Sequence, residues 1–155
     1  MINILVMTHG DLAPGMCQAT QMITGQQQGL DSLSFRPDWS LDRLVNELRA
    51  KLAGFGNDDS TLVMVDMLGG SPSNAIATLI GEGLEVGAVA GANLPMLLEA
   101  VMCRDAATDL PAFARRVCET GRESVIDIAE MLIEDQGRPT EDVLQDQRGP
   151  TAPSR

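Results

Sequence analysis

Aromatic and basic residues are scarce in this chain of 155 residues. Tyrosine is absent, and three phenylalanines and one tryptophan supply the large aromatic side chains, so we do not expect a platform on which nucleobases stack. Eleven Lys and Arg stand against 22 Asp and Glu, which gives a net charge of −11. A surface of this charge repels nucleic acids and anionic membranes, and it favours a protein partner that presents a positive face.

The chain also lacks a long apolar run and any pattern of paired cysteines. No stretch is long enough to span a bilayer, and no basic region precedes the apolar run at the N-terminus, so we expect neither membrane insertion nor a targeting segment. Cys17, Cys103 and Cys118 are odd in number and far apart, without the CxxC spacing of a metal site. We expect reduced thiols, no metal or other cofactor, and a cytoplasmic location.

Strand-like apolar runs alternate with helical patterns along most of the chain. Strands are predicted at residues 2–8, 33–35, 61–66 and 84–90. Helices are predicted at residues 12–24, from a Ser40 cap to Gly54, from Ser71 through Ile80, at 94–102, and from Leu110 to about Gly121. This alternation predicts an α/β fold with an open, doubly wound sheet of four parallel strands and helices on both faces.

The C-terminal part of the chain gives a weaker signal. Residues 125–133 are apolar in a way that fits either a strand or a helix. From residue 135 onward the sequence is polar and rich in Gly, Pro, Gln and Arg, with no apolar period. We therefore predict one domain at residues 1–134, followed by a flexible polar tail or linker at 135–155.

The only histidine, His9, directly follows the first predicted strand, and Asp66 ends the third. Because the carboxyl ends of parallel strands meet at one edge of the sheet, where α/β proteins bind ligands, we expect the two side chains to lie close together. Imidazole is the side chain whose ordinary charge change falls near neutral pH. A carboxylate that accepts from one ring nitrogen leaves the other free to attack, although a histidine at a strand end can also be purely structural.

The segment Gly69-Gly70-Ser71-Pro72 predicts a tight turn into a helix. Ser71 suits the N-cap and Pro72 the first helical position, and the free amides of a helix N-terminus bind anions. Together these features predict a phosphohistidine site in which Asp66 orients His9 and His9 attacks phosphorus. The residues predicted to hold the phosphate are Thr8, Gly10, Gly69, Gly70 and Ser71.

Two other α/β functions fit the residues less well. A receiver domain could be phosphorylated on Asp66, but it needs an acidic pair after the first strand, and here only Asp11 is near. A dinucleotide-binding module needs a GxGxxG turn after the first strand, and that turn is missing.

Four segments resemble a known family. They are residues 4–10 (ILVMTHG), 62–74 (LVMVDMLGGSPSN), 89–99 (VAGANLPMLLE) and 118–122 (CETGR). In this order and spacing they resemble the enzyme IIA component of the mannose family in the bacterial phosphoenolpyruvate:sugar phosphotransferase system (PTS). The resemblance covers roughly residues 1–131.

The resemblance implies that His9 accepts a phosphoryl group from the phosphocarrier HPr and passes it to a histidine of enzyme IIB. Enzyme IIB then phosphorylates the sugar brought in by the membrane components IIC and IID. Asp66 matches the carboxylate that orients the histidine, and Ser71 matches the position beside the phosphate. The resemblance further implies a homodimer, in which a strand within residues 124–130 is exchanged and runs antiparallel at the edge of the partner's sheet.

The chain departs from the family pattern at two places. Family members often carry an aromatic residue in the Asp-x-x-Gly-Gly turn and another after Ser-Pro, where this chain has Met67-Leu68 and Ser73. These departures leave the transported sugar open but not the phosphotransfer residues. A regulatory homologue, phosphorylated on His9 without serving a transporter, also stays open, as does the question of whether IIB is a separate chain.

Overall fold

The computed structural model describes residues 1–56 and 60–134 of the chain. Its strands are β1 (Asn3–His9), β2 (Leu30–Phe35), β3 (Thr61–Val65) and β4 (Gly87–Ala90). Its helices are α1 (Leu12–Thr24), α2 (Leu41–Gly54), α3 (Ser71–Gly81), α4 (Leu94–Cys103), the short 3-10 helix η1 (Arg104–Ala106), α5 (Leu110–Glu123) and α6 (Ile128–Glu134). No helix in these ranges is long and apolar enough to cross a membrane.

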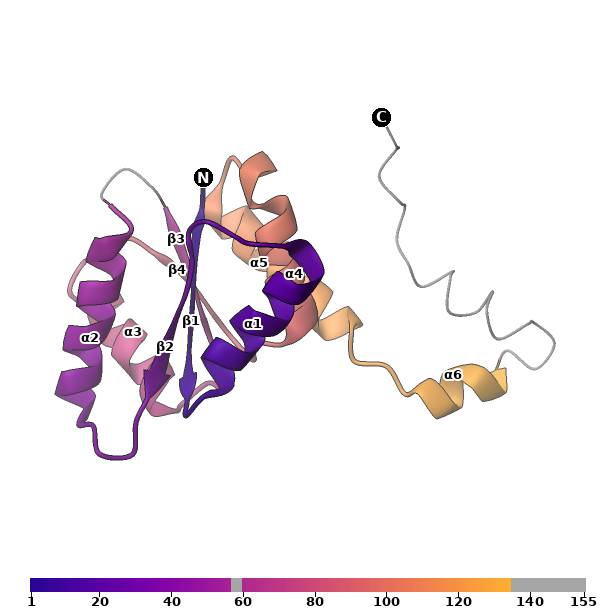
Figure 1. The fold of residues 1–155 in the computed structure, drawn as a ribbon, viewed down its shortest axis with the longest axis horizontal. Coiled ribbons are helices and arrows are strands. Elements are labelled where there is room, and N and C mark those ends of the chain that lie inside the picture. The colour runs from indigo at the N-terminus through magenta and orange to yellow at the C-terminus, as the bar shows by residue number, and fades with distance from the viewer. Residues whose placement is uncertain (57–59, 135–155) are drawn as a thin grey trace. The chain divides into compact units, whose positions relative to one another are not determined.

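The four strands form one parallel sheet in the order β2-β1-β3-β4 (Figure 1). This arrangement confirms the predicted α/β fold. Within the sheet, Met7 of β1 pairs with Val65 of β3, and His9 pairs with Phe35 of β2. The last residues of these three strands therefore lie side by side at one edge of the sheet.

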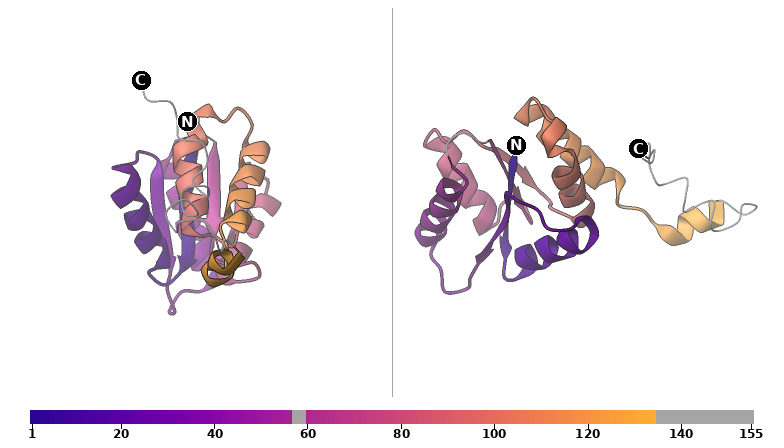
Figure 2. Two further views of the ribbon diagram at one scale, coloured as in Figure 1. Left: turned by 90° about the vertical axis from the view of Figure 1, so that its right-hand side faces the viewer. Right: turned by 45° about the horizontal axis from the view of Figure 1, so that its top comes forward.

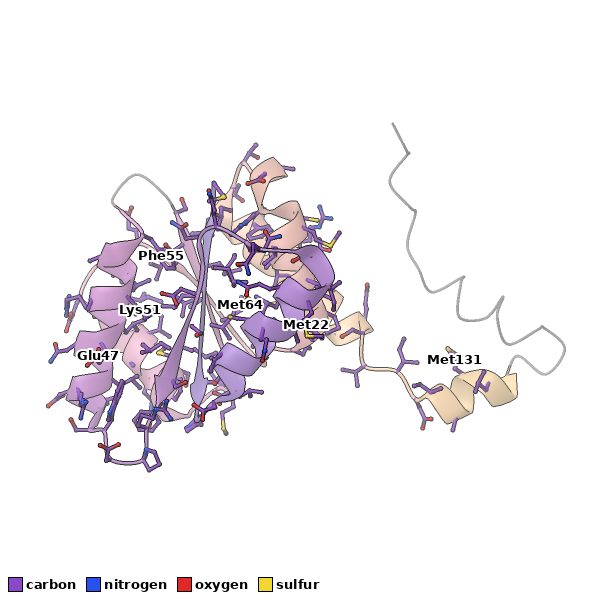
Figure 3. All side chains as sticks on the ribbon, in the orientation of Figure 1. Met22, Glu47, Lys51, Phe55, Met64 and Met131 are labelled. Atoms are coloured by element: carbon purple, nitrogen blue, oxygen red, sulfur yellow. The ribbon has the colours of Figure 1, made fainter. Side chains whose placement is uncertain are left out.

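Helices cover both faces of the sheet. The helices α1, α4 and α5 lie on one side, and α2 and α3 lie on the other (Figure 1; Figure 2, right). Alternate residues of β1 point to the two sides. Ile4 and Val6 join the first core, between the sheet and α1, α4 and α5, and Leu5 and Met7 join the second core, between the sheet and α2 and α3. Because both faces are buried, the strands are apolar without interruption, as parallel strands are. Met64 of β3, labelled in Figure 3, packs on the side of the sheet that α1, α4 and α5 cover.

Side-chain caps begin several of the helices. The hydroxyl of Ser40 accepts the Arg43 N–H at 3.2 Å, as predicted. Asn93 and Asp109 cap α4 and α5 in the same way. The predicted cap of α3 is one residue off, because Gly70 is the N-cap and Ser71 is already helical.

The predicted end of α5 near Gly121 is also corrected. The helix continues to Glu123, and Gly121 is buried inside it, where its missing side chain makes room for Met96 of α4. Gly121 therefore allows α4 and α5 to pack closely and does not mark the end of a helix. Two strands also change length: β2 begins earlier, at Leu30, and β4 later, at Gly87, than expected.

The chain divides into two units, residues 1–124 and 125–155. The antiparallel edge strand expected within residues 124–130 is not a strand in this structure: Ser124 caps the end of α5, and α6 begins at Ile128. The helix has a local cause, since the Asp127 carboxylate accepts the Glu130 N–H at 3.1 Å and the residues that follow are good helix formers. The tail predicted at 135–155 lies outside the described residues.

Candidate functional site

The site lies where the order of the strands reverses. β2 pairs with one edge of β1, and the chain then crosses back so that β3 pairs with the other edge of β1. The carboxyl ends of neighbouring strands diverge at such a point, which leaves room for a ligand. His9 ends β1 and Asp66 directly follows β3, so the two residues meet there. The expected closeness of these side chains is therefore observed.

Asp66 makes three hydrogen bonds that hold it against His9. Its Oδ2 lies 2.8 Å from His9 Nδ1 and accepts the backbone N–H of His9 at 2.9 Å. Its Oδ1 accepts the backbone N–H of Met67, also at 2.9 Å. Because one backbone donor is His9 itself, at the end of β1, and the other is Met67, just after β3, the carboxylate is fixed relative to the imidazole before any ligand binds.

The protonation of Asp66 decides which ring nitrogen is free. Burial alone raises the pKa of Asp66, but the hydrogen bonds from His9 and Met67 outweigh it and hold the pKa below its ordinary value. The carboxylate is thus ionised at neutral pH and can only accept. We therefore assign the ring proton to Nδ1, which leaves the lone pair of His9 Nε2 available for attack.

Two further neighbours hold the imidazole ring in place. The ring of Phe35 meets it edge to face, with 5.6 Å between the centroids and 77° between the planes. On another side lies Gly70, where a Cβ atom would come within 2.8 Å of His9 Cε1 and 3.5 Å of Nε2. Any side chain at Gly70 would displace the ring, so this glycine is required by close approach.

The free nitrogen of His9 lies close to the start of α3. The His9 side chain is 43% exposed, against 15% for Asp66, so a second protein can reach the ring. The first amides of a helix have no partner inside the helix. Here they belong to Ser71 and Ser73, since Pro72 has no N–H, and they follow Gly70 directly. Amides and helix dipole together favour an anion beside Nε2.

The predicted phosphate-binding residues differ in where the structure places them. Gly70 contacts the ring, and Gly69, with φ +83°, makes the turn that precedes it. Ser71 is half-buried as the first residue of α3. The hydroxyl of Thr8 is buried and accepts the Ala13 N–H of the first turn of α1 at 2.8 Å. The N–H of Gly10 donates to the Phe35 carbonyl at 3.0 Å.

Sequence reasoning missed Phe35 as a site residue. The only available signal was its place at the end of the second strand. That signal becomes useful once β2 is known to pair with β1 in the register that sets Phe35 beside His9.

The family of the chain follows from comparison with known proteins. Residues 3–118 match the model of the EIIA-man family, described as the PTS system fructose IIA component. The chain belongs to this family. The match confirms the predicted resemblance, because the EIIA-man family is that of the mannose-type enzyme IIA components of the sugar phosphotransferase system.

Individual relatives and structures of the EIIA-man family agree. The mannose-specific EIIAB component of Escherichia coli K12 is 35% identical over 127 residues, which cover 80% of this chain and 38% of that protein. The fructose-specific EIIA component of Bacillus subtilis is 30% identical over 68% of this chain and 72% of its own length. The EIIA crystal structure from Streptococcus agalactiae has a TM-score of 0.77 at 26% identity, covering 84% of this chain and 99% of that one.

Proposed function

We propose that the chain is a phosphoryl carrier of a sugar phosphotransferase system. His9 accepts a phosphoryl group from phosphorylated HPr and passes it to a histidine of enzyme IIB. The observation that carries this proposal is the 2.8 Å contact between Asp66 Oδ2 and His9 Nδ1, which leaves Nε2 as an exposed nucleophile. Family membership supports the same reaction class.

Each transfer exchanges one bond to phosphorus for another. The lone pair of His9 Nε2 forms a P–N bond while the bond between phosphorus and the donor breaks, and the electron pair of the broken bond stays with the donor. The proton on Nδ1 stays in place, so the phosphorylated ring carries positive charge facing the Asp66 carboxylate. Transfer to enzyme IIB runs the same exchange in reverse, with the acceptor histidine as nucleophile.

The start of α3 supplies the second part of the site. Phosphoryl transfer depends mainly on positioning and on stabilising the charge of the phosphoryl oxygens. In this proposal the Ser71 and Ser73 amides bind those oxygens, and the Ser71 hydroxyl lies beside them. The site therefore needs no metal or other cofactor for a transfer between two histidines.

The receiver-domain alternative finds less support. A phosphorylated aspartate needs a free carboxylate oxygen, and both oxygens of Asp66 are engaged by His9 and Met67. The Asp66 side chain is also only 15% exposed, less than the ring of His9. Among the residues that the structure describes, no feature favours a purely regulatory role over service to a transporter.

The wider assembly is part of the same proposal. Enzyme IIB connects the carrier to the membrane components IIC and IID, and two copies of the chain form a homodimer. The segment that would be exchanged between them carries apolar side chains that are exposed in the single chain: Val125 at 81% and Ile128 at 63%. We propose a cytoplasmic location, because all three cysteines are free and burial raises the pKa of Cys17 to about 11, as for an inert thiol.

A two-stage transfer experiment tests the proposal. The full chain is incubated with phosphoenolpyruvate, enzyme I and HPr, and a IIB protein is added in a second step. We expect radiolabelled phosphate on His9 after the first step and its loss to IIB in the second. The variant His9→Ala is expected to take up no label. Label that reaches His9 but does not move on to any IIB protein would favour the regulatory alternative, and absence of label on wild-type His9 would refute the carrier function.

A further inference from the structure

The positively charged side chain of Arg36 lies at the edge of the sheet that carries His9 and has no role in the proposed transfer so far. Arg36 directly follows Phe35, the residue that pairs with His9 across the sheet and contacts its ring. The Gly10 N–H bonds to the Phe35 carbonyl at 3.0 Å, which ties the loop after β2 to the loop after β1. Because neighbouring strands lie about 4.8 Å apart, Arg36 lies at the same edge of the sheet as His9.

Arg36 forms a weak ion pair with a residue of the loop that follows His9. Its Nη1 lies 3.1 Å from Oδ1 of Asp11, two residues beyond His9. The two side chains are 49% and 74% exposed, and ion pairs this accessible to water contribute little to stability. The guanidinium can therefore leave Asp11 for a stronger anion at low cost. A phosphoryl group is such an anion, since it offers several oxygens to the planar fork of an arginine.

Phosphorylation of His9 places negative charge at this edge of the sheet, and a nearby cation would stabilise it. It adds about two negative charges beside the ionised Asp66, on a chain whose net charge is already −11. Three other cations in the described part of the chain already have partners of their own. Arg49 pairs with Glu82 and Lys51 with Asp31. Arg43 stacks on a tryptophan ring and faces Asp38. Arg36 is the cation that the loops around His9 themselves provide.

We propose that Arg36 is a phosphate-binding residue of the phosphorylated state. When His9 Nε2 carries the phosphoryl group, the Arg36 guanidinium leaves Asp11 and donates hydrogen bonds to the phosphoryl oxygens, opposite the amides of α3. Asp11 acts as the resting partner that holds Arg36 near the site between transfers. This inference rests on the proposed carrier function and adds a residue that sets how strongly His9 holds phosphate.

The equilibrium of phosphoryl exchange tests this role directly. The exchange constant between phosphorylated HPr and His9 is measured for the wild-type chain, Arg36→Gln and Arg36→Lys. Docking to HPr cancels from this constant, so it reports the stability of phospho-His9 alone. The matched control is Arg43→Gln, since Arg43 is similarly exposed, at 52%, and also faces an aspartate. Thermal unfolding checks that each variant is folded.

We expect Arg36→Gln to shift the exchange constant about five- to tenfold away from His9, the order for one partly exposed charge-assisted hydrogen bond. Arg36→Lys is expected to recover part of the loss, and Arg43→Gln to leave the constant unchanged. The variant Asp11→Asn frees Arg36 and is expected to shift the constant toward His9. In the double variant with Arg36→Gln, that gain is expected to shrink, because its source is gone.

A spectroscopic readout separates phosphate binding from a structural role. The ³¹P resonance of phospho-His9, prepared with phosphoramidate as a small donor, is followed against pH. A neighbouring guanidinium favours the more highly charged phosphoryl group, so the resonance is expected to titrate at a lower pH in wild type than in Arg36→Gln. Equal titrations and equal exchange constants in Arg36→Gln and Arg43→Gln would overturn the role of Arg36 alone. Absence of any phosphate on wild-type His9 would instead overturn the carrier function.

Discussion

His9 owes its proposed reactivity to the neighbours that set its proton and its orientation. Asp66 holds Nδ1, Phe35 and Gly70 lie against the ring, and Nε2 is left near Gly70, the N-cap of α3. None of these neighbours is a general acid or a metal. The residues around His9 therefore orient the nucleophile and stabilise charge, which is the contribution that phosphoryl transfer chiefly needs.

Replacing Asp66 removes the group that orients the ring. We expect Asp66→Asn to lower the rate of phosphoryl transfer through His9 by at least about tenfold, because the amide can donate to Nδ1 and so favour the wrong tautomer. The measurement is the single-turnover rate with phosphorylated HPr. An unchanged rate, with the fold intact by circular dichroism, would remove Asp66 from the mechanism.

The same pair gives a pH dependence of stability. The pKa of Asp66 is lower in the folded chain than its ordinary value near 4. The stabilisation from its carboxylate is therefore complete above about pH 4 and is lost as pH falls through the folded pKa. We expect the difference in unfolding free energy between wild type and Asp66→Asn, measured in urea, to shrink as pH falls below about 4. A difference that stays constant over this range would show that Asp66 is not stabilised by its contacts.

Gly70 tests the contact on another side of the ring. In Gly70→Ala, the new Cβ atom meets His9 Cε1 at 2.8 Å, so the ring must move. We expect transfer to slow by about tenfold or more, since small misplacements of a reacting group are costly. The backbone of Gly70, with φ −81° and ψ 169°, suits alanine, so the fold is retained. The control Gly81→Ala lies on the same helix in open space, and a similar loss there would contradict the steric explanation.

The strands and helices position the site residues, and most of these strands and helices could be predicted from the sequence. The helix at 12–24 and the Ser40 cap are observed as predicted, because each has a local signal in periodicity or capping chemistry. His9 and Asp66 could be paired in advance, because both end strands of one parallel sheet. The contact with Phe35 could not, since it depends on strand order and register, which local patterns do not specify.

Other differences arise where tertiary packing overrides a local pattern. Leu84 and Val86 have the apolar character of a strand, yet they pack against the second core ahead of β4 instead of pairing within it. Gly121 has the local signal of a helix end, but the approach of Met96 requires it inside α5. The segment at 125–133 fits two periodicities at once, and its Asp127 cap leads to helix in the structure.

The packing of α4 against α5 gives a prediction for stability. A Cβ atom at Gly121 would clash with Met96 Cγ and lie 2.6 Å from its sulfur, and Met96 is buried. We expect Gly121→Ala to lower the free energy of unfolding by about 1–3 kcal/mol, the usual cost of overpacking. Phosphoryl transfer per folded molecule is expected to be unchanged. Adding Met96→Ala to Gly121→Ala removes the clash, so the double variant should lose less unfolding free energy in urea than the sum of the two single losses. Strict additivity would contradict the contact.

At the level of the whole chain, residues 1–124 and 125–155 form separate units. The proposed homodimer requires the second unit, whose described part exposes apolar side chains. We expect the full chain to sediment at twice its 16.5 kDa mass and a chain ending at Ser124 to sediment as a monomer. The shortened chain should still accept phosphate on His9 from phosphoramidate. A monomeric full chain at high concentration would contradict the proposed dimer but leave the site untouched.

The most direct test of the central claim is the chemical identity of the phosphorylated residue. The full chain is phosphorylated through HPr and divided between acidic and alkaline conditions, and the modified residue is located by mass spectrometry. The account predicts a single phosphate on His9 that survives alkali and is lost in acid. A phosphate lost in alkali and located on Asp66, or label that persists in His9→Ala, would contradict it.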